Sequence, residues 1–188
     1  MEDLVRTFIA VELTDSVREQ IARLEQPLRK EGTKVKWVKP ENLHLTLKFL
    51  GNVQAVRIDD VVEATQEAVQ GIEPFILSFS GLGLFPNLKR ARVIWIGIEQ
   101  RADSLGRIQR ELEERLFQRG FAREERGFSP HLTIGRVKSQ RGIGGLVSKL
   151  DKTEFESEKI RVDQVVVMRS DLRPTGAVYT PLGVCQLV

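Results

Sequence analysis

Cysteine, tyrosine and histidine are scarce in this chain of 188 residues, which contains one cysteine, one tyrosine and two histidines. Because Cys185 is alone, no disulfide can form within the chain, and we expect a small buried side chain and a reducing compartment, the cytoplasm. Two histidines without acidic or cysteine neighbours at ligand spacing make an incomplete metal site, so neither a metal ion nor a cofactor is expected. No apolar run is long enough to span a bilayer, and no membrane partner is expected.

The remaining composition is that of an ordinary globular protein. The hydrophobic fraction is 41%, the charged fraction 29% and the formal net charge +3, which is compatible with an anionic ligand but does not indicate a long duplex-binding surface. Residues 1–6 are acidic where a signal peptide would be basic, so no leader is expected. The length predicts one compact unit over residues 1–188, and we expect a monomer.

Periodicity predicts strands alternating with helices. Residues that alternate or are rich in β-branched side chains predict strands at 5–13, 34–38, 43–50, 75–82, 92–98, 154–162, 164–170 and 179–187, with another beginning at the second histidine. Apolar residues at helical spacing predict a helix that starts with a Ser16–Glu19 capping box and ends near Gly32, two more around 58–69 and 105–116, and a short one ending near Leu150. Loops are expected at 51–52, 81–87 and 171–175. Short connections between adjacent strands favour an α+β fold with antiparallel sheets and outer helices.

The two histidines open nearly identical tetrapeptides. His44-Leu45-Thr46-Leu47 lies in the first half of the chain, and His131-Leu132-Thr133-Ile134 in the second. Side chains two residues apart in a strand point to the same side, so each motif presents an imidazole beside a hydroxyl. Regular alternation would add Lys48 to the first polar face and Gly135 to the second, and would turn Phe49 and Arg136 toward the opposite faces.

If the two strands face one another, two imidazoles and two hydroxyls line one cleft. Histidine can act as an acid or a base near neutral pH, so one ring could remove a proton from water while the other protonates a leaving oxygen. The threonine hydroxyls could stabilise the charge on a phosphate, without a metal ion. This pattern therefore predicts displacement at phosphorus, although the residues alone do not say which histidine is the acid.

A structural role is the alternative for each of these residues. A histidine or threonine in a single strand is more often a packed, hydrogen-bonded residue, but the duplication of the motif in a chain with no other histidine favours function. Arg136, Lys48 and Lys138 are candidates for phosphate contact, and each could equally be a solvated strand charge. Trp37 and Phe49 could stack on a base, with core packing as the alternative.

Longer stretches around both motifs resemble a known family. The segments are Trp37-Val38-Lys39-Pro40-Glu41-Asn42 running into the first motif, Gly81-Leu82-Gly83-Leu84-Phe85-Pro86, and Phe128-Ser129-Pro130 running through the second motif to Arg136. Paired His-x-Thr-x motifs are the signature of the 2H phosphoesterase superfamily, and the flanks resemble its RNA 2′,3′-cyclic phosphodiesterase branch, also called 2′-5′ RNA ligase-like. The likeness covers nearly the whole chain. Family members often have Ala where this chain has Gly135.

The resemblance implies a bilobal, pseudo-two-fold α+β fold with two antiparallel sheets lining a central cleft. It implies that RNA ends bearing a 2′,3′-cyclic phosphate are hydrolysed to 2′-phosphomonoesters, with His44 as proton donor, His131 as proton acceptor, Thr46 and Thr133 as phosphate ligands and Arg136 assisting. Ligation to a 5′-hydroxyl is formally the reverse reaction. A cyclic phosphodiesterase acting on a small nucleotide and a non-catalytic RNA-end-binding module are the alternative hypotheses.

Overall fold

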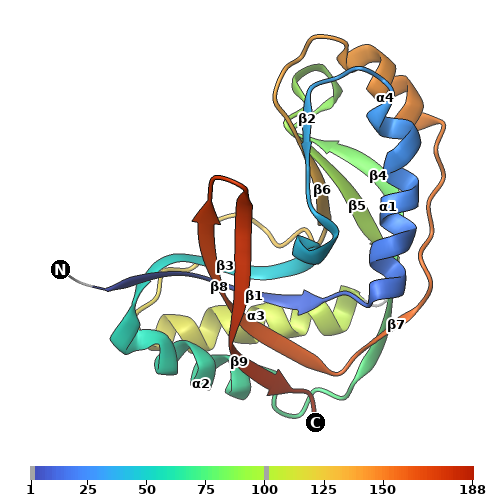
Figure 1. Ribbon diagram of the computed structural model, residues 1–188. Coiled ribbons are helices and arrows are strands. Elements are labelled where there is room, and N and C mark those ends of the chain that lie inside the picture. The colour runs from blue at the N-terminus through green and yellow to red at the C-terminus, as the bar shows by residue number, and fades with distance from the viewer. Residues whose placement is uncertain (1–2, 100–101) are drawn as a thin grey trace.

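The computed structural model describes residues 3–99 and 102–188, which form two antiparallel sheets flanked by helices (Figure 1). Met1 and Glu2, part of the segment that argued against a leader, lie outside the described residues. The lower sheet has the strand order β3 (His44–Gln54), β1 (Leu4–Glu12), β8 (Gln164–Arg173) and β9 (Gly176–Gln186). The upper sheet has the order β2 (Val35–Trp37), β6 (Leu132–Val137), β5 (Val93–Glu99), β4 (Phe75–Phe85) and β7 (Ile160–Val162). The α+β prediction is confirmed.

The two halves of the chain follow the same path but exchange one strand. The order β1, α1 (Asp15–Arg29), β3, α2 (Ile58–Val69), β4 is repeated as β5, α3 (Ala102–Gln118), β6, α4 (Ile143–Asp151), β8. As a result β3-β1-β8 in the lower sheet corresponds to β6-β5-β4 in the upper sheet. Helices α2 and α3 pack together against the lower sheet, and α1 and α4 lie beside the upper one (Figure 1). Each sheet therefore depends on a strand from the other half.

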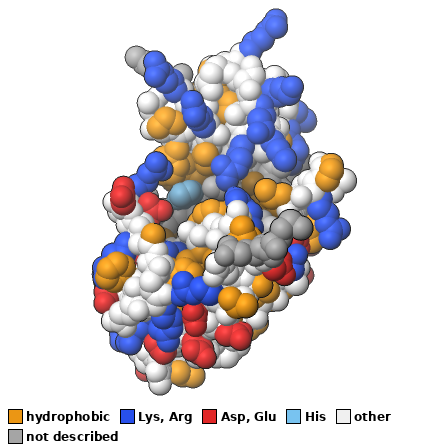
Figure 2. Space-filling view, turned by 90° about the vertical axis from the view of Figure 1, so that its left-hand side faces the viewer, with side chains coloured by type: hydrophobic (Ala, Val, Ile, Leu, Met, Phe, Trp, Pro, Cys, Tyr) orange, Lys and Arg blue, Asp and Glu red, His pale blue; other side chains and the backbone are white. Residues whose placement is uncertain are grey.

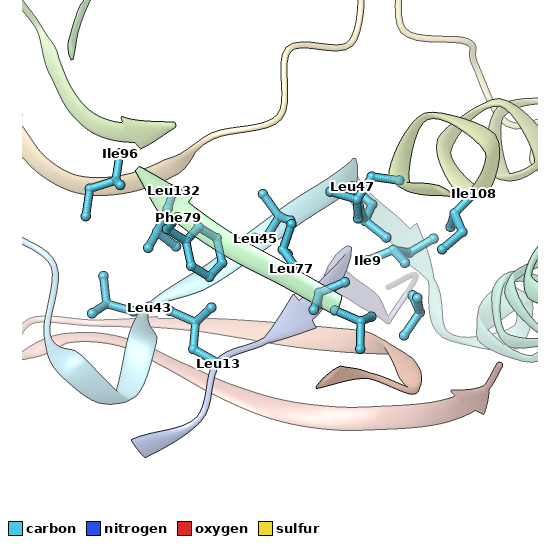
Figure 3. Packing of buried hydrophobic residues seen from close by; sticks show 14 of the residues in the cluster. Ile9, Leu13, Leu43, Leu45, Leu47, Leu77, Phe79, Ile96, Ile108 and Leu132 are labelled. Carbon is cyan, nitrogen blue, oxygen red and sulfur yellow. The ribbon is translucent and has the colours of Figure 1, made fainter. Parts of the chain in front are cut away.

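One apolar core joins the two sheets. Figure 3 shows Ile9 and Leu45 of the lower sheet near Leu77, Phe79 and Leu132 of the upper sheet, and all five side chains are buried in the same cluster. The leucines that follow His44 and His131 are thus anchored in a common core, and this anchoring fixes the backs of both motif strands. None of the described helices is both long and apolar enough to cross a membrane.

Several predicted boundaries differ from the structure. Thr14, not Ser16, caps α1, because its Oγ1 accepts a hydrogen bond from the Val17 amide at 3.3 Å. Strands β3 and β4 do not end at their glycines but continue through Gly51 and Gly81, whose positive φ angles accompany irregularities within paired strands. Strand β8 extends beyond residue 170 to Arg173 and forms a long hairpin with β9, while only 160–162 of the predicted strand 154–162 form β7.

We predict that Glu25 makes the stability of the fold fall as the pH rises. Burial raises the pKa of this α1 carboxyl to about 7, although Arg29 contacts one of its oxygens at 2.6 Å; the other oxygen has no hydrogen-bond partner among the described residues. The folded state therefore holds the proton more tightly than the unfolded chain, and stability is lost between about pH 4.5 and 7. Glu25→Gln should raise the free energy of unfolding at pH 8 by about 1–3 kcal/mol.

Urea denaturation at pH 5 and pH 8 measures this effect. The exposed Glu19→Gln on the same helix is the matched control and should leave the difference between the two pH values unchanged. If Glu25→Gln were less stable than the wild type at pH 8, the pairing with Arg29 would outweigh the burial of the charge, contrary to the prediction.

Candidate active site

A cleft of about 630 Å³ lies between the two sheets and is closed on one side by the β8–β9 hairpin. Figure 2 shows a histidine at the bottom of this hollow. Eight of the nine candidate residues singled out in the sequence line the cleft: Trp37, His44, Thr46, Phe49, His131, Thr133, Arg136 and Lys138. Lys48 does not. The structure thus brings the two His-x-Thr motifs together, as expected from their duplication.

Both motif strands have an irregularity at the same position. On β1, Ala10 is opposite Thr46 and Ile9 is opposite Lys48, so Leu47 has no partner of its own. On β5, Trp95 is opposite Thr133 and Ile94 is opposite Gly135, which leaves Ile134 unpartnered. An extra residue of this kind reverses the alternation of side chains that follow it. The two motif strands therefore share not only their order in the fold but also the position of the bulge, one residue after the threonine.

Because of these bulges, the side chains that follow each threonine face the opposite side of the strand from the one predicted. Phe49, which regular alternation assigned to the core, is half-exposed and lines the cleft, and Arg136 lines it from the other motif. The Lys48 side chain instead points to the buried side of its strand, and Gly135 is buried as well. A Cβ on Gly135 would lie 2.9 Å from Val35 Cγ1, so an alanine at this position would require the Val35 side chain to shift.

The prediction that Lys48 contacts the substrate is therefore wrong. Its side chain is 4% exposed, and its Nζ lies 2.6 Å from Glu113 Oε2 on α3 and 2.8 Å from the Ala122 carbonyl oxygen. Glu113 also accepts hydrogen bonds from Gln109 and from the Glu124 amide. Lys48 thus connects the first motif strand to α3 and to the loop that leads toward the second motif.

Each imidazole is held in the same way. Nδ1 of His44 lies 2.8 Å from the Asn42 carbonyl oxygen, and Nδ1 of His131 lies 2.8 Å from the Ser129 carbonyl oxygen. Since a carbonyl can only accept, Nδ1 carries the proton in both rings. Nε2 is then left as the nitrogen that can exchange a proton with a ligand.

The surroundings of the two rings differ. His44 packs against Phe8, with ring centroids 4.6 Å apart, and meets the edge of Tyr179 at 5.1 Å. Burial lowers the pKa of His44 below its usual 6.5; the Asn42 hydrogen bond opposes this shift, and the charge of Arg18 adds to it. His131 makes an edge contact with Phe85 at 5.0 Å.

Three residues of the cleft were not predicted from the sequence. Tyr179, Asn42 and Arg6 all line the cleft, and Arg6 lies 4.6 Å over the Phe49 ring. The side chain of Asn42 donates a hydrogen bond to the Ala177 carbonyl of the hairpin at 2.8 Å. Burial raises the pKa of Tyr179, and the charges of Arg136 and Arg6 oppose the shift. Only the rarity of tyrosine in this chain could have pointed to Tyr179, because the hairpin reaches the cleft through tertiary structure.

Other chemistries receive less support from the described residues. Among residues 3–99 and 102–188, no group of three His, Cys, Asp or Glu side chains could hold a metal ion. The predicted burial of Cys185 is confirmed: the residue is 1% exposed, and burial raises the pKa of its thiol to about 11. A thiol that is protonated at neutral pH and inaccessible is a poor nucleophile. The histidines are therefore the reactive groups of this cleft.

Two His-x-Thr strands that face one cleft in this fold define the 2H class of phosphoesterases. Comparison with known families agrees, since the LigT-like phosphoesterase family matches the chain twice, at residues 11–95 and 96–179. The chain therefore belongs to the LigT-like phosphoesterase family. The resemblance inferred from the motifs is confirmed, and the two matched segments correspond closely to the two halves of the pseudo-two-fold.

Individual relatives extend over nearly the whole chain. The RNA 2′,3′-cyclic phosphodiesterase of Methanothermobacter thermautotrophicus is 38% identical over 186 residues, which are 97% of this chain and 99% of the relative. That of Thermotoga maritima is 36% identical over 182 residues, 97% of this chain and 95% of the relative. Escherichia coli LigT complexed with 3′-AMP superposes with a TM-score of 0.79 at 25% identity, covering 99% of both chains.

We predict that the pKa of His44 responds to Tyr179. With only two histidines, the imidazole NMR signals of the protein can be assigned with a single variant, His131→Ala. The pKa of His44 should lie below 6.5, and Tyr179→Ser should raise it, because water would reach the ring. Val178→Ser, next to Tyr179 on β9 and not part of the cleft lining, is the matched control. A His44 pKa at or above 6.5 in the wild type would contradict the assigned environment.

We also predict that Lys48 contributes to stability through its ion pair. Lys48→Met should lower the free energy of unfolding by about 3 kcal/mol, because the Glu113 carboxylate would remain buried without its cation. The double variant Lys48→Met/Glu113→Gln should recover part of this loss, and chemical denaturation measures both. A Lys48→Met protein of wild-type stability would show that the ion pair contributes nothing to the fold.

Proposed function

We propose that this protein hydrolyses RNA 2′,3′-cyclic phosphate ends to 2′-phosphomonoesters, as a single-domain monomer in the cytoplasm. The observation that carries the proposal is the placement of two imidazoles in one cleft, each with Nδ1 bound to a backbone carbonyl and Nε2 free to exchange a proton. Because both motifs come from one chain, the site needs no second copy. The names of relatives that match nearly the whole chain support the substrate.

The reaction needs one base and one acid. His131 Nε2 takes a proton from water, the water oxygen bonds to phosphorus, and the bond from phosphorus to the 3′ oxygen breaks while His44 supplies a proton to that oxygen. The product carries a 2′-phosphate and a 3′-hydroxyl. Since burial lowers the pKa of His44, its imidazolium is a stronger acid than ordinary histidine, and an anionic phosphate in the cleft favours the protonated form.

The neighbouring side chains bind the phosphate and the terminal nucleobase. Thr46 and Thr133 donate hydrogen bonds to the non-bridging oxygens, and Arg136 adds a positive charge where negative charge grows in the transition state. Phe49 and Trp37, both in the cleft lining, offer aromatic faces for the terminal base. The E. coli relative was solved with 3′-AMP, a nucleotide that carries its phosphate on the ribose.

We predict that the purified protein, in EDTA, converts an RNA with a 2′,3′-cyclic phosphate end into the 2′-phosphate. His44→Ala and His131→Ala should each lower kcat by roughly 10²–10⁴-fold, because each removes one proton-transfer group. Product analysis by chromatography distinguishes 2′- from 3′-phosphates.

Three outcomes would count against this proposal: release of a 3′-phosphate, dependence on a divalent ion, or a histidine variant with wild-type turnover. Ser129→Ala is a suitable control, since its neighbour His131 is bound by the backbone carbonyl of Ser129 and not by its side chain. This variant should retain turnover within about threefold of the wild type.

A further inference from the structure

The upper sheet ends in a ribbon of two strands that carries four uncompensated positive charges. Lys36 on β2 lies directly opposite Arg136 on β6, and Lys34 lies opposite Lys138, whose amide donates a hydrogen bond to the Lys34 carbonyl at 2.7 Å. All four residues are exposed. We call this group the cationic square.

The square faces the cleft and not the core. Lys36, Arg136 and Lys138 line the cleft, and Lys34 is two residues from Lys36, so it shares the same side of the ribbon. The alternate residues Val35 and Val137 pack against the core. In Figure 2 the Lys and Arg side chains crowd the upper lobe above the histidine, whereas the acidic side chains of this view lie level with the histidine or below it.

No described carboxylate neutralises these charges. None of the four side chains forms an ion pair within the part of the chain that the structure describes. Like charges directly opposite one another on neighbouring strands destabilise a sheet. An arrangement that costs stability in the free protein calls for a ligand that supplies the missing negative charge.

The direction of β6 indicates which ligand fits. The strand begins beside His131, and Thr133, Arg136 and Lys138 follow on its cleft side. At about 3.3 Å per residue this row extends roughly 20 Å from the catalytic histidine. A cleft of about 630 Å³ accommodates a ligand of drug size, so a longer RNA must leave it.

We propose that the three lysines of the cationic square bind the backbone phosphates of the RNA strand that precede the cyclic end, while Arg136 contacts the cyclic phosphate itself. This inference rests on the proposed function and extends it: the preferred substrate is a polynucleotide end. A cyclic mononucleotide, which contacts Arg136 but not the three lysines, is used less well. Phosphate contacts by lysine and arginine carry no sequence information, so the preference concerns length and not sequence.

The test compares two substrates and two matched triple variants. The substrates are a ten-nucleotide RNA ending in a 2′,3′-cyclic phosphate and 2′,3′-cyclic AMP. The test variant is Lys34→Gln/Lys36→Gln/Lys138→Gln. The control, Lys30→Gln/Lys152→Gln/Lys159→Gln, removes the same charge from three exposed lysines outside the cleft lining.

For the test variant, kcat/KM on the RNA should fall about 10–100-fold at low salt, and the slope of log kcat/KM against log salt should decrease by about 2. Its kcat/KM on 2′,3′-cyclic AMP should change by less than about threefold, and the control should keep the preference for RNA. The test variant should also melt at the same or a higher temperature, because repulsion within the ribbon is removed. Equal losses on both substrates, or equal behaviour of the two triple variants, would overturn the proposal.

Binding separates this inference from the proposed function. If the wild type turned over neither substrate, the proposed function would fail, but the square could still be tested with a fluorescent ten-nucleotide RNA ending in a 2′-phosphate. Its anisotropy should then report at least about tenfold tighter binding to the wild type than to the test variant. Equal affinities of the wild type and the test variant for this RNA would contradict the inference, whatever the catalytic result.

Discussion

The active site depends on one constraint: the unpaired residue that follows each threonine. Leu45 and Leu132 anchor the backs of the motif strands in the core between the sheets, so the histidines and threonines must face the cleft. The bulges at Leu47 and Ile134 then shift the alternation by one residue. Without them Phe49 and Arg136 would point away from the cleft.

The same motif acquires two environments because it lies in two different sheets. In the lower sheet the long β8–β9 hairpin brings Tyr179 against His44, and Phe8 of the central strand closes the other side. The upper sheet has no corresponding hairpin beside His131 among the described strands. A reaction that needs an acid and a base gains from this difference, since identical surroundings would favour the same protonation state in both rings.

The fold class, the helices and the pairing of the two motifs could be predicted from sequence because they depend on local periodicity and on a duplicated pattern. The faces of Lys48, Phe49 and Arg136 could not, since they depend on register with β1 and β5, which lie far away in the chain. The same limit applies to Tyr179 and Asn42, which meet through the hairpin. Glycine is typical of turns, so the sequence predicted that the strands end at Gly51 and Gly81. In the structure both glycines instead lie at bulges within continuous strands.

The charges of the cleft lie mainly on one sheet, and this follows from the same geometry. Lys48, the cation of the lower motif strand, is turned inward and neutralised by Glu113. Arg136, one position further from its threonine, is turned outward and joins Lys36 across the ribbon. A bulge of one residue thus directs the cation of one half into the fold and that of the other half toward the ligand. The pseudo-two-fold scaffold thus presents two unlike walls to a ligand: the lower wall carries Arg6 among aromatic side chains beside His44, and the upper wall carries Lys36, Arg136 and Lys138 beside His131.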